Sequence, residues 1–272
     1  MQPGFAEVAG LVRRRAGIVL TEDKSYLLET RLGPVLARFG FASLGALGAK
    51  LRALPEEALE RAVVEALTTH ESSFFRDGKP FEHLRAALPK LLAARGAGDR
   101  LRIWSAACST GQEAYSVAML ATETLGTAAQ RLDILATDIS ADVVRRAKEG
   151  SFSQFEVQRG LPIRALMTHF QQEGTRWRIK PALRAMVRFE ERNLLAECAT
   201  LGRFDVIFCR NVLIYFDPPT KTRVLEMMAR QLATDGVLYL GAAETVIGLT
   251  ERLAPIPGER GAYGLAARKA AA

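Results

Sequence analysis

Three polar residues stand where apolar segments of the chain end, and each could bind part of a nucleotide-like cofactor. Asp138 ends the run LDILATD, Asn193 lies near the end of MVRFEERNL, and Asn211 follows FDVIFCR. A carboxylate at a strand end can accept both ribose hydroxyls, and the two amides could contact adenine and an amino-acid head group. A turn is the alternative for each asparagine. Asp138 could instead cap the next helix, but Ser140 is available for that role, which favours the ligand interpretation.

A loop of small residues, ACSTGQ (107–112), precedes a predicted helix that begins near Glu113. Small residues let the backbone approach a ligand closely, and the start of the helix offers free N–H groups. The loop has one glycine, Gly111, and lacks the GxGxxG pattern of dinucleotide sites. It therefore disfavours NAD and favours a cofactor without phosphates, such as S-adenosylmethionine, whose product is S-adenosylhomocysteine. Glu113 could receive a cation or hydrogen-bond the loop, and an ordinary helix-opening glutamate is equally consistent.

These residues require an α/β framework that brings strand ends together. Apolar runs of strand length alternate with helical segments, which predicts βαβ units and a parallel sheet. Asp235-Gly236 is interpreted as a turn before the strand VLYLG, and residues 254–268 as a closing hairpin. The predicted strands are 101–106, 132–138, 186–194, 204–210 and 237–241, and the predicted helices of this part are 113–126, 140–150 and 218–232.

The chain is predicted to have three parts. Residues 1–67 form a small helical domain, in which Gly33-Pro34 is expected to kink or split one helix. Residues 68–79 are a linker that contributes to the active site, and residues 80–272 are the α/β domain. A basic, polar insertion at about 150–186 interrupts the alternation and contains one helix-like segment and one short strand.

Composition argues against several classes of protein. The 272 residues are 49% hydrophobic and 25% charged, as in ordinary globular chains. No run approaches the roughly 20 apolar residues of a membrane span, and the first residues lack the order of a signal peptide. Three cysteines without a CxxC pair, together with three histidines, argue against a metal site and for a reduced, cytoplasmic compartment.

The net charge of +7 is unevenly distributed. Residues 145–192 carry eleven Lys/Arg and five Asp/Glu, whereas residues 1–77 carry ten of each. The basic segment could face an acidic partner or nucleic acid, although a solvated basic face is the simpler interpretation. Its aromatic content is low, with Trp177 nearly alone, which argues against nucleic acid.

Four segments, taken in order, resemble the chemotaxis receptor methyltransferases, the CheR family. They are TTHESSFFRD, IWSAACSTGQEAYS, LATDIS and FDVIFCRNVLIYFD, and with the N-terminal helices the resemblance covers nearly the whole chain. It implies a Rossmann-like S-adenosylmethionine-dependent methyltransferase fold with an inserted small β-subdomain and an N-terminal helical domain. It also implies a cytoplasmic protein-glutamate O-methyltransferase, which methylates glutamate side chains on the cytoplasmic helices of chemoreceptors.

The resemblance also assigns roles to residues by their position in the motifs. Arg76 and Tyr215 would border the reacting centre. The linker departs from the family's N-x-T-x-F-F-R pattern at His70, which replaces an amide. A late strand ends in GAAE where the family often has G-H-S-E. The implied cofactor contacts are His70, Ser72, Arg76, Glu113, Asp138, Asn193, Leu194, Asn211 and Val212, and no metal is implied.

A basic stripe in the helical domain is the predicted docking surface for the receptor. Lys24, Arg31 and Arg38 recur every seven residues, in the domain with which the family contacts receptor helices. An ordinary solvated face is the alternative. In some members the β-subdomain binds a receptor's C-terminal pentapeptide through a glycine-containing loop. Here the matching stretch FQQEGTRWRIK is short and has one glycine, which suggests a member that does not require the pentapeptide.

Two rival functions remain at this stage. One is a methyltransferase that acts on nucleic acid, and the other is a cofactor-binding module that docks on receptors without catalysis. The intact FFR and NVLIYF segments argue against the second. Asp217-Pro218-Pro219 resembles the DPP motif of amino-group methyltransferases but opens a helix, so we interpret it structurally. The protein is expected to be a monomer that does not insert into membranes.

Overall fold

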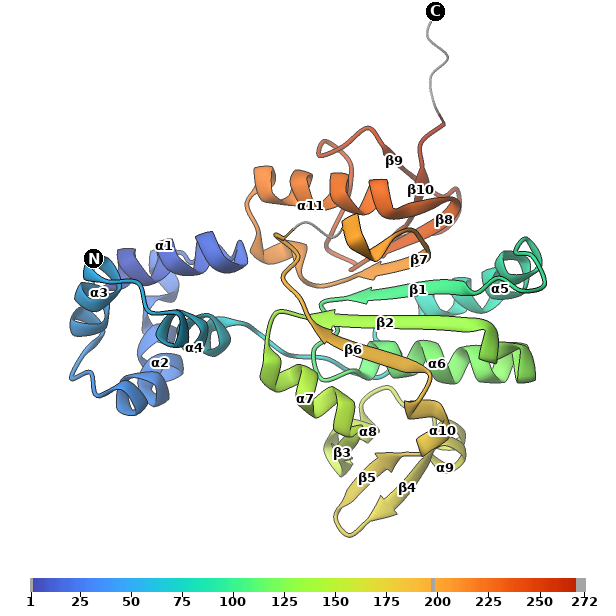
Figure 1. Ribbon diagram of the computed structural model, residues 1–272, viewed down its shortest axis with the longest axis horizontal. Helices are drawn as coiled ribbons and strands as arrows, with labels where there is room; N and C mark the ends of the chain where they lie inside the picture. The colour runs from blue at the N-terminus through green and yellow to red at the C-terminus, as the bar shows by residue number, and fades with distance from the viewer. Residues whose placement is uncertain (1, 197–198, 268–272) are drawn as a thin grey trace, which may run out of the picture. The chain divides into compact units, whose positions relative to one another are not determined.

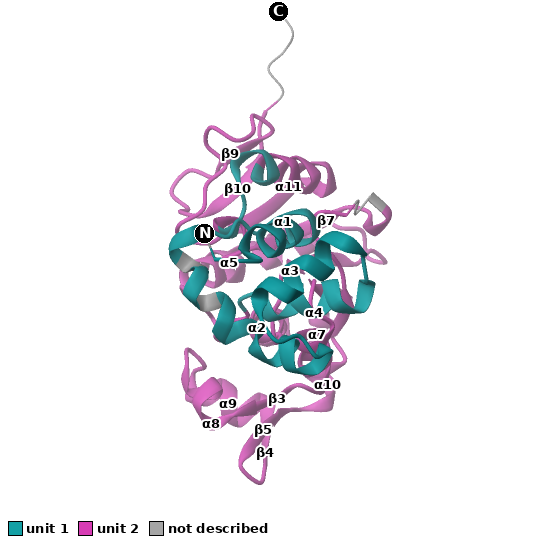
Figure 2. Ribbon diagram, turned by 90° about the vertical axis from the view of Figure 1, so that its left-hand side faces the viewer, with its two compact units in different colours: residues 1–69, 215–221 teal, residues 70–214, 222–272 magenta. Residues whose placement is uncertain are grey.

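The chain folds into two compact units in the computed structural model, which describes residues 2–196 and 199–267 (Figure 2). Unit 1 comprises Met1–Thr69 and Tyr215–Lys221, and unit 2 comprises His70–Ile214 and Thr222–Ala272. The later segment of unit 1 is joined to its first helix and the residues after it, because Ile18 and Phe216 form a β-bridge and Arg13 Nη2 lies 2.6 Å from Asp217 Oδ2.

Unit 1 is mainly helical. Its second helix runs unbroken through Gly33-Pro34, so the predicted split at this point is wrong. Buried Leu28 and Leu32 hold one face of this helix, while exposed Pro34 removes only its own backbone hydrogen bond. The elements are α1 Phe5–Ala16, η1 Glu22–Lys24, α2 Ser25–Phe39, α3 Leu44–Ala53 and α4 Glu57–Leu67.

Among residues 2–196 and 199–267, no helix is by itself long and apolar enough to cross a membrane; the pair Leu28–Phe39 and Leu44–Ala53, bent by 64°, passes on length and composition. In the same residues, no cluster of three or more His, Cys, Asp or Glu is placed to hold a metal ion. Cys108 and Cys209 are buried thiols whose pKa is raised by burial, and Cys198 lies outside the described residues.

Unit 2 contains a seven-stranded sheet in the order β6-β2-β1-β7-β8-β10-β9 (Figure 1). The first five strands of that order are parallel, and β10 pairs antiparallel with β8 and β9. The strand order reverses between β1 and β7, and ligands bind in open α/β sheets outside the carboxyl ends of strands at such a reversal. The strands are β1 Leu101–Ala106, β2 Leu132–Asp138, β6 Val187–Glu191, β7 Phe204–Cys209, β8 Leu232–Leu240, β9 Leu253–Pro255 and β10 Ala262–Leu265.

Helices α6 and α7 pack along β2 and β6 of this sheet (Figure 1). The start of α6 is tightly packed, because a Cβ added to Gly111 would lie 3.1 Å from Ala147 Cβ and 3.2 Å from Phe189 Cζ. Gly111 also has φ 95°, so both space and backbone favour glycine there. The helices are α5 Lys79–Ala93, α6 Gln112–Leu125, η2 Gly126–Arg131, α7 Ala141–Glu149, η3 Ala199–Leu201, η4 Leu213–Tyr215 and α11 Pro218–Gln231.

The basic insertion forms a three-stranded antiparallel sheet in the order β3-β5-β4, with short helices beside it. Two of its strands were not predicted, β3 with three residues and β4 with four. Each contributes a phenylalanine to one aromatic cluster, in which the ring of Phe74 lies 5.0 Å from Phe152 and 5.7 Å from Phe170. The elements are β3 Ser151–Ser153, α8 Gln154–Gln158, α9 Ile163–His169, β4 Phe170–Glu173, β5 Arg176–Ile179 and α10 Pro181–Arg184.

The predicted turn at Asp235-Gly236 lies within β8. The pairing of β7 and β8 jumps from Phe204↔Leu232 to Val206↔Val237, so the residues between Leu232 and Val237 form a bulge rather than a turn that precedes the strand. Arg95 holds the bulge, because its Nη2 lies 2.7 Å from Asp235 Oδ1. The predicted closing hairpin is present as β9 and β10.

Candidate active site

Strained backbone marks one edge of the sheet in unit 2. In residues 2–196 and 199–267, the non-glycine residues with positive φ are Phe75, Asp77, Ala107, Ser109 and Asn211. They lie in the linker, in the loop after β1, and directly beyond β7. Such conformations cost about 1–3 kcal/mol each and persist where the surrounding structure holds them, which is common at functional sites.

Asp138 is buried at the end of β2, and its carboxylate faces the loop after β1. Its Oδ2 accepts a hydrogen bond from Ser109 N (2.8 Å), and its Oδ1 accepts one from Ser140 N (3.1 Å). Burial raises the pKa of Asp138, and these backbone donors oppose the shift. Ser140 caps α7 through Val143 N, as expected. A carboxylate oxygen can accept more than one donor, so the Asp138 carboxylate fits the predicted contact with ribose hydroxyls.

Glu113, in the first turn of α6, is held by its own chain. Its Oε1 accepts from Ser105 Oγ (2.8 Å), and its Oε2 accepts from Arg210 Nη1 (3.1 Å). Burial raises the pKa of Glu113, and the charge of Arg210 opposes this. One of the contacts considered for Glu113, that with a cation, is therefore made in part by Arg210 of the protein itself.

The linker crosses the loop after β1 and the start of α6. The carbonyl of His70 accepts from Ser109 Oγ (2.7 Å), and Phe75 N donates to Ser116 Oγ (3.0 Å). Ser72, between these two anchors, is half-buried. The linker thus places His70 next to the loop whose backbone also binds Asp138.

Arg76 is half-buried, and its Nη1 donates to the carbonyl of Glu71 at 3.2 Å. Its remaining donors are compatible with a carboxylate from a substrate, because the guanidinium has five N–H groups. Tyr215 belongs to unit 1, where its carbonyl accepts from Val19 N (2.9 Å). The predicted place of Tyr215 beside Arg76 therefore remains a prediction.

Asn193 and Leu194 follow β6 next to the end of β2, because Arg192 N donates to the Asp138 carbonyl at 2.8 Å. The side-chain oxygen of Asn193 accepts from Leu195 N (2.9 Å), which is the turn role considered above. A cofactor contact by Asn193 and Leu194 remains a prediction.

Glu244, which the sequence analysis did not select, holds the segment after β7. Its Oε2 accepts from the backbone N–H groups of Asn211 (2.9 Å) and Gly241 (2.7 Å). Its Oε1 accepts from those of Val212 (2.9 Å) and Ile214 (3.3 Å). Asn211 and Val212 are thereby fixed at the carboxyl end of β7, where a cofactor contact is predicted.

A pocket of about 540 Å³ lies beside Glu244, at the end of β8. Its lining includes Asp77 of the linker together with Gly241, Arg260 and Tyr263. This volume is within the usual range for small-ligand sites.

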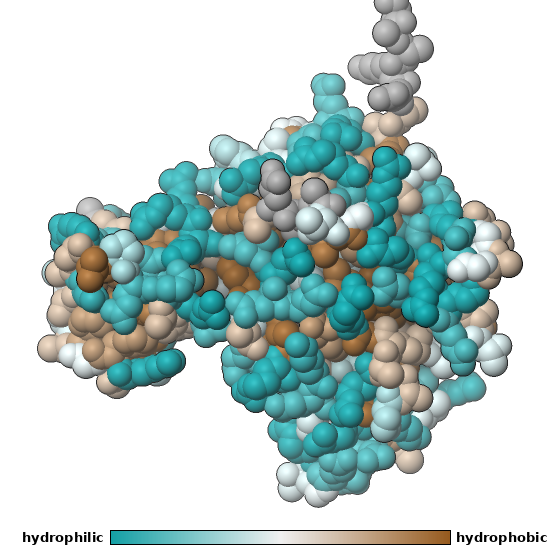
Figure 3. Space-filling model, viewed as in Figure 1, coloured by the Kyte–Doolittle hydropathy of each residue, from teal (hydrophilic) through white to brown (hydrophobic). Residues whose placement is uncertain are grey.

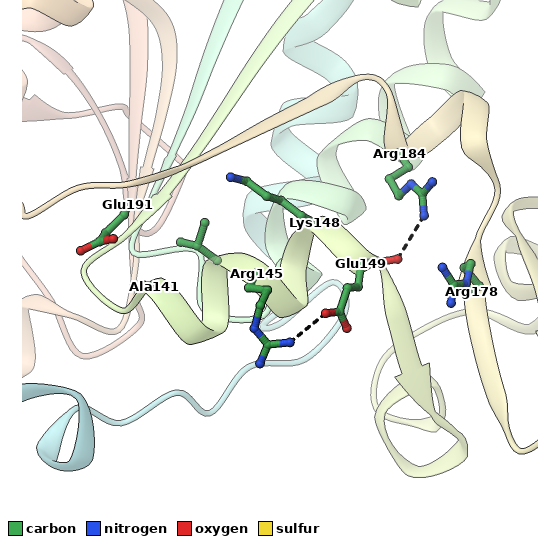
Figure 4. A pocket seen from close by; sticks show the side chains of 8 residues that line it. Ala141, Arg145, Lys148, Glu149, Arg178, Arg184 and Glu191 are labelled. Carbon is green, nitrogen blue, oxygen red and sulfur yellow. Dashed lines mark hydrogen bonds and ion pairs between the residues drawn. The ribbon is translucent and has the colours of Figure 1, made fainter. Parts of the chain in front are cut away.

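The basic insertion forms a second hollow, of about 620 Å³, with α7 (Figure 4). Its arginines are largely engaged: Arg145 Nη1 lies 2.8 Å from Glu149 Oε1, and Arg178 Nε lies 2.7 Å from Glu173 Oε2. Arg184 donates to the carbonyl of Glu149 at 3.2 Å. Figure 3 shows a mainly hydrophilic surface over this region. The excess charge of the segment thus lies on a solvated face with many internal ion pairs.

The predicted docking stripe is only partly available. Arg31 is half-buried and donates to the carbonyl of Leu67 (3.2 Å) and to Thr69 Oγ1 (3.3 Å). Arg38 is exposed, and its Cζ lies 5.2 Å from the ring centroid of Phe39. The side chain of Lys24 lies outside the described part of the structure. Arg38 is therefore better placed than Arg31 to meet a partner.

The parallel sheet, its strand reversal and the acidic strand end define a Rossmann-like α/β domain. A family model described as "CheR methyltransferase, SAM binding domain" matches residues 70–262, and one described as "CheR methyltransferase, all-alpha domain" matches residues 3–68. The chain belongs to the CheR methyltransferase family.

Curated relatives match nearly the full length of the chain. Chemotaxis protein methyltransferase Cher2 of Pseudomonas putida is 39% identical over 91% of this chain and 92% of its own. Chemotaxis protein methyltransferase 1 of Pseudomonas aeruginosa is 42% identical over 88% and 89%, and the Escherichia coli chemotaxis protein methyltransferase is 36% identical over 91% and 86%. A solved structure of PKMT2 from Rickettsia typhi with AdoHcy is 14% identical, with a TM-score of 0.37 over 60% of this chain and 24% of that one.

Proposed function

We propose that this protein transfers a methyl group from S-adenosylmethionine to glutamate side chains on the cytoplasmic helices of chemoreceptors. The position of the linker supports this assignment of roles. Hydrogen bonds to Ser109, Ser116 and Arg210 hold the linker at the edge formed by β1 and β7. It brings Arg76 to the same edge as Glu113 and Asp138. The products are a glutamate methyl ester and S-adenosylhomocysteine.

S-adenosylmethionine supplies a methyl group on a positively charged sulfur. In our proposal, Asp138 binds the ribose hydroxyls, Glu113 contacts the cofactor while paired with Arg210, and Asn193, Leu194, Asn211 and Val212 contact the rest of the cofactor. His70 and Ser72 complete the site from the linker.

The acceptor carboxylate needs no general base, because the reference pKa of glutamate is about 4.3 and the group is ionised at neutral pH. The protein must instead orient the carboxylate and exclude water, which can lower a barrier by roughly 7–11 kcal/mol at best. Arg76 suits this task, since a guanidinium pairs with a carboxylate in a fixed geometry. Tyr215 is proposed to donate to the same carboxylate, and Phe75 to form part of the wall.

The finer features of partner binding also belong to this proposal. The protein would act in the cytoplasm as a monomer, with Arg38 and its neighbours on α2 facing the acidic receptor helices. It would not need a C-terminal pentapeptide. The hairpin of β4 and β5 supports this, because Gly174 and Thr175 alone separate the two strands.

Incubation with labelled S-adenosylmethionine and receptor cytoplasmic fragments from the same cell tests the proposal. We expect base-labile methyl esters on receptor glutamates, in equal yield on fragments with and without the last residues of the receptor. Label on RNA or DNA, with binding that weakens steeply with salt, would support the nucleic-acid rival. Cofactor binding without any label transfer would support the non-catalytic module.

A further inference from the structure

Arg210 is a buried guanidinium that contacts two parts of the site at once. It follows β7, and only 1% of its side chain is exposed. Its Nη2 donates to Asp77 Oδ2 (2.6 Å) and to the carbonyl of Arg76 (2.8 Å), while its Nη1 donates to Glu113 Oε2 (3.1 Å). One side chain thus joins the linker to the first turn of α6.

The environment of Arg210 leaves its guanidinium little freedom. A charge removed from water needs partners, and the two carboxylates with the Arg76 carbonyl supply them to Nη1 and Nη2, whereas Nε is buried without a hydrogen-bond partner among the described residues. The ring of Phe81 lies 5.8 Å from Arg210 Cζ, close enough for a cation–π contact. Because the donors of arginine form a planar fork, the positions of Asp77 and Glu113 are linked geometrically.

The linker depends on such anchors at this point. Phe75 and Asp77 have φ values of 47° and 68°, and Gly78 N donates to the Phe75 carbonyl at 3.0 Å to close the turn. Left-handed residues persist only where their surroundings hold them. Arg210 binds the second half of this turn, at the carbonyl of Arg76 and the side chain of Asp77.

We propose that Arg210 is a positioning residue, which orients Arg76 through the Arg76 carbonyl and Asp77 and couples that orientation to Glu113. This inference rests on the proposed function, in which Arg76 meets the acceptor carboxylate and Glu113 belongs to the cofactor site. Arg210 has two arms: its hydrogen bonds to the linker, at Asp77 and the Arg76 carbonyl, and its hydrogen bond to Glu113. Their loss has different consequences. Loss of the Asp77 arm disturbs the linker alone, whereas loss of the fork disturbs the linker and Glu113 together.

Two variants separate these arms. Asp77→Asn keeps the side-chain shape and tolerates the left-handed backbone, and the Asp77 side chain is 40% exposed, so the fold is expected to survive. We expect kcat for receptor methylation to fall about tenfold, with the Kd for S-adenosylhomocysteine within about twofold of wild type. Arg210→Lys retains the charge without the fork. Here we expect kcat to fall about 10²-fold and the Kd to rise about fivefold, since Glu113 loses its fixed partner.

Lys90→Ala is the control, because Lys90 is exposed on α5 and lies outside both the linker and the proposed machinery. Hydrogen exchange at the amides of residues 73–78 gives a readout that needs no turnover. Exchange there should be faster in both variants and unchanged in the control. If Arg210→Lys does not fold, Asp77→Asn with its exchange and kcat measurements still decides the question.

Wild-type kcat and wild-type exchange in Asp77→Asn would overturn the proposal, as would an equal loss in Lys90→Ala. An increase of cofactor Kd in Asp77→Asn as large as in Arg210→Lys would also overturn it, because the arms would then not be separate. If the wild-type protein methylates no receptor fragment, the proposed function fails. The exchange comparison would still test whether Arg210 holds the linker.

Discussion

Replacement of Glu244 by glutamine tests whether one buried carboxylate holds the cofactor edge of the sheet. Glu244 is 8% exposed and accepts four backbone N–H groups, two on each oxygen. Glutamine has nearly the same shape but has one oxygen and one NH₂ group. In either orientation of the amide, two N–H donors lose their acceptor and face another donor.

The expected loss of stability follows from these bonds. A hydrogen bond to a charged group contributes about 1.5–3 kcal/mol, so two lost bonds amount to about 3 kcal/mol at the lower end. For a domain of 150–250 residues, each kcal/mol shifts Tm by about 2–4 °C. We therefore expect Glu244→Gln to lower Tm by about 6–12 °C.

The same change should weaken cofactor binding. Asn211 has φ 59° and donates to Glu244, so its position relaxes when the carboxylate is gone. We expect the calorimetric Kd for S-adenosylhomocysteine to rise about tenfold, which corresponds to about 1.4 kcal/mol. Glu251→Gln is the control: Glu251 is exposed on the following segment, and an exposed substitution normally changes stability by about 0.5 kcal/mol or less. A Glu244→Gln protein that melts within about 2 °C of wild type and binds with unchanged Kd would refute the anchoring role.

Three further predictions concern the proposed cofactor, acceptor and receptor contacts. Asp138→Ala should weaken cofactor binding by about 1–3 kcal/mol if it leaves ribose hydroxyls unpaired; an unchanged calorimetric affinity in a folded variant would remove Asp138 from the site. Arg76→Ala should lower kcat far more than it lowers Tm, because the change removes the side-chain hydrogen bond to the Glu71 carbonyl and keeps the Arg76 carbonyl that Arg210 binds; normal methyl-transfer rates would exclude the assigned role. Reversal of Arg31 and Arg38 to Glu should raise the receptor KM at low salt and leave cofactor Kd unchanged, and Arg38→Glu alone should account for most of the increase, since Arg31 is bonded within its own unit. If receptor kinetics do not respond to the double reversal, the docking face lies elsewhere.

Sequence patterns predicted the strands of the sheet well where each strand is a continuous apolar run. The bounds of β1 and β2 coincide with the runs LRIWSA and LDILATD, because both strands are buried on two faces. The insertion was predicted less completely. Its outer strands, SFS and FQQE, carry one apolar residue each, so no apolar alternation marks them.

The residues that hold the site together were the least predictable. Arg210 was visible as a polar residue at a strand end, but its partners Asp77 and Glu113 lie 133 and 97 residues away in the sequence. Glu244 binds backbone N–H groups. Every residue type except proline has one, so the residue types of its partners do not reveal the contact. An acid four residues beyond the end of β8, in GAAE, was the available signal, and the comparison with G-H-S-E emphasised the absent histidine instead.

The burial of Phe74 affects how the protein folds during synthesis and how far the chain can be shortened. It is part of the linker, yet it is fully buried against two rings of the insertion, and a Cβ on Gly160 would lie 2.1 Å from its carbonyl oxygen. During synthesis, residues 70–79 therefore cannot form their native contacts until about a hundred later residues have been made. Contacts over such sequence separations form slowly. An engineered minimal enzyme without residues 150–186 would leave this phenylalanine in water. The insertion is thus a part of the catalytic domain's own assembly, and not an accessory that evolution or design could remove freely.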